Sequence, residues 1–225
     1  ATDCQLFKRI PIEPPFIDCT VIDPFSFSDD LTTFLRNYLK DHPSATFSFF
    51  GFSIGSLLIS QLIQYLSITT CTLPISNIIF CGLRFSYSSS EIDTLKSGLR
   101  LNKRKQLKHF YRACFHSPQE YKLFFNDLGK RYLSLFESTL LLTGLTYLEK
   151  YQCLDEQGLT ELTASISPTR VRFQLFQGSF DLIAPLTKLE AKTNDADHKS
   201  TRCDSFQLYK FETGHIPFFN ETSCN

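Results

Sequence analysis

The sequence predicts an α/β fold, in which helices flank a mostly parallel central sheet and an all-helical segment is inserted between two parts of the sheet. Three observations support this prediction. Short apolar runs alternate with a helical pattern between residues 45 and 83, strand-like alternation returns at 171–176 and 206–211, and the stretch between them shows helical spacing. A chain of 225 residues is long enough to bury the core of such a fold.

The first half of the sheet is expected in residues 42–83, which contain no Asp, Glu, Lys or Arg. Residues 45–50 (ATFSFF) are short, aromatic and β-prone, which is typical of a strand. The leucines and Tyr65 that follow Gly55 recur at helical spacing, and residues 77–82 (NIIFCG) form another apolar run. Because strands and helices alternate here, the strands should pair in parallel.

Further elements are expected on both sides. Residues 18–24 form a strand pattern that ends in proline, and residues 28–30 (Ser-Asp-Asp) are expected to cap a helix that runs to Lys40. Residues 171–176 and 206–211 alternate polar with apolar side chains. We expect these two segments to be late strands of the same sheet.

The stretch between the two parts of the sheet is expected to be a helical insertion, with helices broken at Pro118 and Gly129. We therefore expect residues 1–89 and 156–225 to form the core domain and residues 90–155 to form a helical cap. The first strand of the core is expected to be missing from the chain.

Charge and cysteine content exclude several classes of protein. Lys plus Arg and Asp plus Glu both count 23, so no net charge attracts nucleic acid. Residues 47–66 are uncharged over the length of a membrane span, but their glycines, serines and glutamines and the lack of flanking basic clusters argue against stable insertion. The 8 cysteines form no C-x-x-C pair, which with the lack of a signal sequence predicts a cytoplasmic protein with reduced thiols.

The sequence Gly51-Phe52-Ser53-Ile54-Gly55 lies between the predicted strand and helix, the context that gives the pattern G-x-S-x-G its meaning. The glycines leave space for a strained turn that exposes the Ser53 hydroxyl. The N–H group of Ile54, at the start of the helix, can stabilise a developing oxyanion. Ser53 is therefore the candidate nucleophile, with Ile54 and Phe52 as candidate oxyanion and substrate-binding residues.

A serine nucleophile needs a base and an acid that orients the base. Asp181 follows the strand at 171–176, and His215 follows the strand at 206–211. Both side chains should emerge at the sheet edge that displays Ser53, and the order Ser, Asp, His is that of strand-turn-helix hydrolases.

Other aspartate and histidine residues are less suited to these roles. Asp204 precedes the last strand and so lies at the wrong edge, and the remaining rivals are expected in loops or on the surface, away from strand ends. They are Asp195, Asp197, His198, His42, His109 and His116. No paired cysteines and no His-x-x-x-His spacing predict a metal site, and the chemistry of a serine hydrolase requires no cofactor.

These motifs resemble the α/β-hydrolase superfamily. Their surroundings are similar to one branch, the pimeloyl-[acyl-carrier protein] methyl ester carboxylesterases of biotin synthesis. The stretches that carry the resemblance are residues 50–55 (FGFSIG), 143–148 (TGLTYL), 177–185 (QGSFDLIAP) and 214–219 (GHIPFF). The resemblance implies that Ser53 is the nucleophile, His215 the general base and acid, and Asp181 the residue that orients His215.

The resemblance also implies a substrate, a methyl-capped dicarboxylic acyl chain on acyl carrier protein, and a partner, the acidic carrier itself. No acidic residue occurs between Asp93 and Glu120, a stretch of the cap rich in basic residues. A basic surface there would steer an acidic carrier, whereas a solvated helix face would have the same composition. The basic residues expected to meet the carrier are Arg100, Lys103, Arg104, Lys108 and Arg112.

Alternatives within and outside this class stay open. The same triad would serve an acyl thioesterase or a general short-chain carboxylesterase, because the cap decides the substrate. In members of the family, a His-Gly or Pro-Gly turn before the segment that residues 1–7 resemble donates a second oxyanion N–H, and the chain holds no such turn. Loss of one such donor costs roughly 3 kcal/mol of transition-state stabilisation, so a non-catalytic binding protein with this fold is the alternative from another class.

Overall fold

The computed structural model describes residues 23–154, 156–167, 170–185 and 206–216. The strand expected at residues 18–24 lies almost wholly outside them. The elements follow in the order α2 (Phe27–Asp41), β1 (Phe47–Phe52), α3 (Ile54–Ile68), β2 (Ile75–Cys81), α4 (Ser89–Ala113), α5 (Pro118–Phe124), the π-helix η1 (Phe125–Gly129), α6 (Lys130–Leu135), α7 (Ser138–Lys150), α8 (Glu156–Ile166), β3 (Arg172–Gly178) and β4 (Phe206–Phe211).

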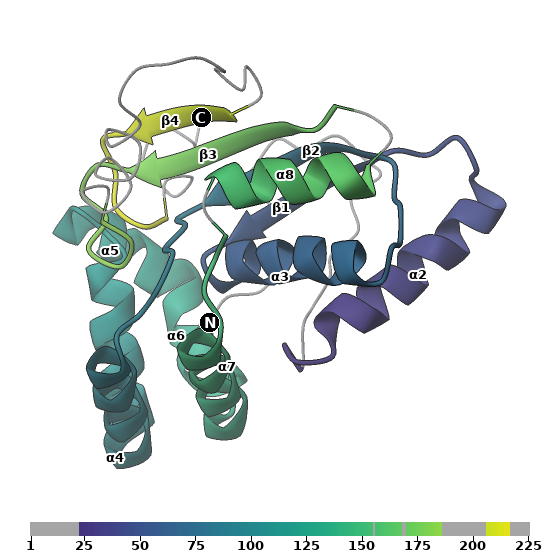
Figure 1. Cartoon of the computed structure of the whole chain (residues 1–225). Helices are drawn as coiled ribbons and strands as arrows, with labels where there is room; N and C mark the ends of the chain where they lie inside the picture. The colour runs from purple at the N-terminus through teal and green to yellow at the C-terminus, as the bar shows by residue number, and fades with distance from the viewer. Residues whose placement is uncertain (1–22, 155, 168–169, 186–205, 217–225) are drawn as a thin grey trace.

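The described strands form one parallel sheet in the order β1-β2-β3-β4. The register aligns Phe52 with Cys81, Cys81 with Phe176, and Phe176 with Tyr209. Because all strands run the same way, their C-terminal ends meet at one edge, toward which the cap helices lie (Figure 1). The predicted fold class, a parallel sheet flanked by helices with a helical insertion, is confirmed.

The main core lies between the sheet and the helices α3 and α8, which cover the same face of the sheet (Figure 1). Leu62, Ile63 and Leu66 of α3 and Ile78 and Phe80 of β2 are fully buried. Each such side chain contributes about 1.5–3 kcal/mol by leaving water. The charge-free stretch is thus divided into a strand and a core helix, as its periodicity indicates. No helix among the described residues has the length and hydropathy that crossing a bilayer requires.

Helix α2 begins earlier than its expected cap. Ser26 is the N-cap residue, and its hydroxyl donates to the carboxylate of Asp30 at 2.7 Å. The side chain of Asp23 accepts from the N–H of Phe25, so the chain turns before residue 28. The predicted cap at residues 28–30 was therefore wrong, and Asp29 and Asp30 lie in the first turn, where their charge favours the positive end of the helix.

Helix α4 is a helical hairpin. It begins with a capping box between Ser88 and Glu91, and the backbone leaves helical geometry at Asn102, with φ −156° and ψ 87°. The side chain of Asn102 accepts from the N–H of Lys105 at 2.9 Å and so begins the second arm. This break was not predicted, because asparagine is also compatible with the middle of a helix.

The remaining cap helices end close to the expected breaks. Helix α5 begins with Pro118 and a capping box between Ser117 and Glu120, and η1 ends at Gly129. A second hydrophobic core joins the cap helices to the end of the sheet, where it includes Phe52 of β1 and Cys81 of β2. Tyr111, Phe124 and Tyr132 are fully buried in this core. These rings come from α4, α5 and α6, so aromatic packing holds the short helices together.

The two glycines of the motif at 51–55 should respond differently to substitution. A Cβ on Gly51 would lie 2.7 Å from the backbone of Gly55 and Ser56, whereas a Cβ on Gly55 meets nothing within 4 Å. Gly51→Ala should lower the free energy of unfolding by about 1–3 kcal/mol. Gly55→Ala, the matched control, should leave it unchanged or raise it by up to about 1 kcal/mol. Denaturant unfolding measures both, and equal losses would contradict the prediction.

Candidate active site

Ser53 forms the whole connection between β1 and α3. Its backbone has φ 54° and ψ −117°, a conformation that costs a non-glycine residue about 1–3 kcal/mol. The N–H of Ser53 donates to the carbonyl of Cys81 at 2.8 Å, which fixes the turn to the end of β2. The N–H groups at the start of α3, beginning with Ile54, follow directly, so a helix N-terminus stands next to the serine.

Asp181 lies in the turn after β3, and its side chain is fully buried. One carboxylate oxygen, Oδ1, accepts from the N–H groups of Ile183 and Ala184 at 2.8 and 2.7 Å. The other, Oδ2, accepts from Gln177 Nε2 at 2.9 Å and from His215 Nδ1 at 2.7 Å. These donors compensate the desolvation of the carboxylate, which would otherwise cost several kcal/mol.

His215 follows β4 and is 1% exposed. The backbone N–H of His215 donates to the carbonyl of Cys114 at 2.8 Å, and the ring centroid of His215 lies 5.2 Å from that of Phe52, the residue before Ser53. The ring also lies against Gly82, which has φ 61° and whose Cβ would come within 2.6 Å of the imidazole. The end of β2 therefore needs glycine to make room for this histidine.

The bond to Asp181 fixes the tautomer of His215. With the Asp181 carboxylate as acceptor, Nδ1 is the donor, and in a neutral imidazole the lone pair then lies on Nε2. Nε2 is buried and has no hydrogen-bond partner among the residues that the structure describes. The Ser53 hydroxyl is thus not bonded to it in this structure. Such bonds are often long in free enzymes and tighten when substrate binds. A ring nitrogen that has no partner within the described part of the chain is nonetheless present at the edge that carries Ser53.

Cys81 and Cys114 support the site through their carbonyls rather than their thiols. Each carbonyl accepts the N–H of a candidate catalytic residue, Ser53 or His215. Burial raises the pKa of both thiols well above the usual value, so they stay protonated. Both are free cysteines, as is Cys71.

Gln177 is a site residue to which the sequence analysis assigned no role. It lies in β3, is fully buried, and donates both to Asp181 and to the carbonyl of Ala184. Both neighbours can only accept, which fixes the orientation of the amide. A signal was present, because Gln177 stands four residues before Asp181 in a stretch that resembles the family.

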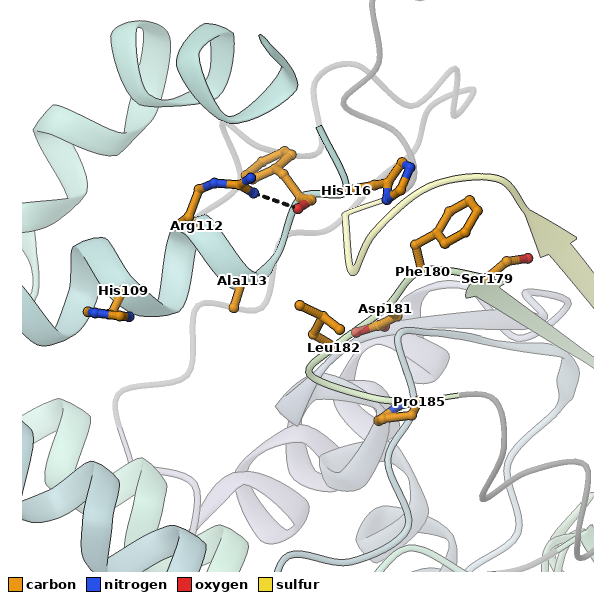
Figure 2. A pocket seen from close by; sticks show the side chains of 10 residues that line it. His109, Arg112, Ala113, His116, Ser179, Phe180, Asp181, Leu182 and Pro185 are labelled. Atoms are coloured by element: carbon orange, nitrogen blue, oxygen red, sulfur yellow. Dashed lines mark hydrogen bonds between the residues drawn. The ribbon is translucent and has the colours of Figure 1, made fainter. Parts of the chain in front are cut away.

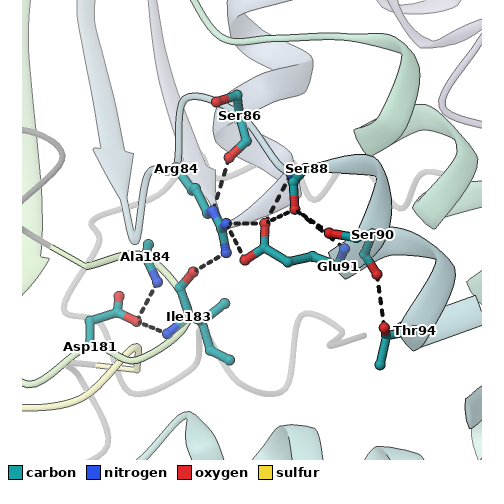
Figure 3. Close-up of polar contacts among 9 residues, drawn as sticks. All are labelled: Arg84, Ser86, Ser88, Ser90, Glu91, Thr94, Asp181, Ile183 and Ala184. Atoms are coloured by element: carbon teal, nitrogen blue, oxygen red, sulfur yellow. Dashed lines mark hydrogen bonds and ion pairs between the residues drawn. The ribbon is translucent and has the colours of Figure 1, made fainter.

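Arg84 was also missed. It lies in the loop between β2 and α4, and Figure 3 shows how it joins the start of the cap to the loop that carries Asp181. Its guanidinium binds both carboxylate oxygens of Glu91 at 2.6 and 2.7 Å and donates to the carbonyl of Ile183 at 3.2 Å. Hydrogen bonds from Arg84 first, and then from Ser88, lower the pKa of Glu91 to about 2.

A pocket of about 710 Å³ opens between the end of α4 and the loop after β3 (Figure 2). His109 and Arg112 line it from α4, and His116 stacks on Phe180 with ring centroids 3.9 Å apart. His109 and His116 were rejected as catalytic bases, and both are exposed on the cap side. Of the other rivals, His42 stacks on Tyr38 of α2, whereas Asp195, Asp197, His198 and Asp204 lie outside the described residues.

The five basic residues assigned to the carrier surface lie on the two arms of α4 or at the bend between them, and they differ in their contacts. Lys103 donates to the carbonyl of Phe136 at 2.9 Å, and Arg112 donates to the carbonyl of Phe115 at 2.9 Å. Of these five residues, Arg100, Arg104 and Lys108 are exposed. Within the described part of the chain, no group of three or more His, Cys, Asp or Glu side chains is placed to hold a metal ion.

No protein-family model and no curated protein sequence matches the chain. Solved structures do. An esterase from Exiguobacterium antarcticum is 18% identical, with a TM-score of 0.58 over 87% of this chain and 68% of its own. A thermophilic esterase from Thermogutta terrifontis is 15% identical, with a TM-score of 0.60 over 92% and 70%.

A third similar structure, the bromoperoxidase from Bacillus anthracis, is 18% identical, with a TM-score of 0.58 over 89% of this chain and 71% of its own. An enzyme described as an alpha/beta hydrolase, from a deep-sea metagenome library of the Medee basin, matches with a TM-score of 0.53 at 15% identity, over 85% of this chain and 66% of its own. At such identities the likeness concerns the fold. Together with the parallel sheet and the strand-turn-helix at Ser53, it shows that the chain has the α/β-hydrolase fold.

Proposed function

We propose that the chain is a serine carboxylesterase in which Ser53 is the nucleophile, His215 the general base and Asp181 the residue that orients it. The observation that carries this proposal is the buried pair of Asp181 and His215, joined at 2.7 Å. The other ring nitrogen of His215, Nε2, is buried without a hydrogen-bond partner among the described residues, at the sheet edge where the strained turn displays a serine. A buried polar atom left unpaired costs about 1–3 kcal/mol, which favours a functional reason for it.

The proposed reaction has two stages. The hydroxyl oxygen of Ser53 attacks the ester carbonyl while Nε2 of His215 takes its proton. The bond between the carbonyl carbon and the ester oxygen then breaks, and Nε2 passes the proton to that oxygen, which leaves as the alcohol. Water attacks the acyl-serine in the same way, with Nε2 as base, and releases the acid and the free serine. The N–H of Ile54 at the start of α3 would stabilise the oxyanion, a contribution of about 3 kcal/mol.

For the substrate, we propose the methyl ester of a pimeloyl chain on acyl carrier protein, a step of biotin synthesis. The resemblance of the four sequence stretches supports this, as does the excess of basic side chains on the cap. Arg100 and Arg104 are exposed, one on each side of the bend at Asn102. An acidic carrier would be attracted to such side chains.

Comparing three substrate classes tests the specificity. The proposal expects the methyl ester on the carrier to give a higher kcat/KM than free methyl esters or acyl thioesters. Equal values for all three would instead support a general short-chain carboxylesterase, and a preference for thioesters would support an acyl thioesterase. Both outcomes would reject the carrier-specific substrate while retaining Ser53 as nucleophile.

Ser53→Ala should abolish labelling by a fluorophosphonate probe and lower kcat by roughly 10⁶-fold, because no other hydroxyl occupies the turn. The matched control is Ser67→Ala in the last turn of α3, where the hydroxyl of Ser67 lies near that of Ser165, and this variant should label like the wild type. Intact mass after labelling measures the result. A wild-type chain that folds but does not label would support the non-catalytic alternative, and a Ser53→Ala chain that still labels would show that Ser53 is not the nucleophile.

Reversing Arg100 and Arg104 to Glu should raise KM for the carrier-borne ester on the order of tenfold, because the charges that attract an acidic carrier are inverted. Turnover of a small free ester should not change. The matched control reverses Arg36 and Lys40, two exposed basic residues on α2. Steady-state kinetics at low and high salt measure the effect. If both double variants raise KM equally, the cap does not bind the carrier.

A further inference from the structure

A residue outside the loop after β3, Arg84, contacts the peptide that binds the carboxylate of Asp181. The N–H of Ala184 donates to Asp181 Oδ1 at 2.7 Å, and the carbonyl of the same peptide unit, that of Ile183, accepts from Arg84 at 3.2 Å. One rigid peptide plane therefore has the guanidinium at its oxygen and the carboxylate at its N–H (Figure 3). A cation at the carbonyl polarises the peptide and strengthens the hydrogen bond that its N–H donates.

Arg84 is itself firmly positioned. Its side chain is 11% exposed, and Nε donates to the carbonyl of Ser86 at 3.0 Å. The guanidinium lies 4.1 Å from the ring centroid of Tyr87 and binds Glu91 through both carboxylate oxygens. A guanidinium group with contacts on several sides has few alternative rotamers, so Arg84 can fix the position of the peptide that it binds.

The counter-charge belongs to the cap. Glu91 closes the capping box of α4, because it accepts from the N–H of Ser88 at 2.9 Å while Ser88 caps the N–H of Glu91. The first turn of the cap, Arg84, the peptide at 183–184 and Asp181 thus form one continuous chain of hydrogen bonds, with His215 at its end.

We infer that Arg84 is a positioning residue, which acts through the peptide between Ile183 and Ala184 to hold the Asp181 carboxylate in the orientation that its bond to His215 needs, and which couples that bond to the first turn of the cap. The expected effect of Arg84 on turnover rests on the proposed function. The state of the hydrogen bond between Asp181 and His215 can be observed without turnover.

Arg84→Met tests the inference, because methionine keeps much of the stem but removes the charge and every donor. We expect kcat for a small ester to fall about 10²-fold with little change in KM, since a displacement of the orienting group by about 1 Å has an effect of that size. Arg84→Lys keeps the charge without the fork, and it should restore part of the loss.

The cap offers a matched control. Lys96 donates to Glu149 at 2.5 Å and joins α4 to α7, and its side chain is 13% exposed, much like that of Arg84. This pair has no part in the hydrogen-bond chain to Asp181. Lys96→Met should therefore cost comparable stability, measured by thermal unfolding, and leave kcat within about twofold of the wild type.

The decisive measurement is the low-field proton resonance of the Nδ1–H of His215, in protein labelled with ¹⁵N-histidine and assigned by its loss in Asp181→Asn. The resonance should shift or broaden in Arg84→Met and stay in place in Lys96→Met. In Arg84→Lys it should lie between these two positions, and this variant keeps the test possible if Arg84→Met does not fold. An unchanged resonance in the folded arginine variants, or equal changes in Lys96→Met, would overturn the inference. Failure of the proposed function is distinguishable, because wild-type protein would then not turn over substrate while the resonance still responded to Arg84.

Discussion

The hydrogen bond between Asp181 and His215 sets the constraint that much of the surrounding structure meets. Both side chains are almost fully excluded from solvent, and an ionised carboxylate in such a place needs every lone pair satisfied. Two backbone N–H groups, the amide of Gln177 and the imidazole do this together. The loop after β3 must therefore keep one shape, because a displacement of any donor would leave part of the charge uncompensated.

Glycines at the strand ends allow the elements of the site to approach one another closely. Gly51 allows α3 to return close to β1, and Gly82 leaves space for the imidazole. At Gly214 a Cβ would lie 2.4 Å from the carbonyl of Cys114, so the chain of the cap passes directly over the loop of His215. Any side chain at these points would force apart elements that the site needs in contact.

The cap is connected to the core at the two loops that carry the acid and the base. The carbonyl of Cys114, at the end of α4, accepts from the N–H of His215, and Arg84 joins the first turn of α4 to the loop of Asp181. A substrate that moves the cap would move both contacts. This arrangement suits an enzyme in which the cap selects the substrate and the core performs the reaction, as proposed for the acyl chain and Ser53.

By itself, the sequence determined the alternation of strands and helices, the parallel sheet and the turn at Ser53, because hydrophobic periodicity and the glycine pattern are local properties. The β4 strand has the predicted bounds, and Asp181 and His215 were both selected from their places after strands. Only the tertiary structure decided how that pair is supported. Arg84 and Gly82 take their roles from contacts with Ile183 and His215, which are far away in the sequence. Gln177 takes its role from the way in which the turn after β3 folds back toward it. No local pattern encodes such contacts, because they exist only once separate strands and the cap are brought together.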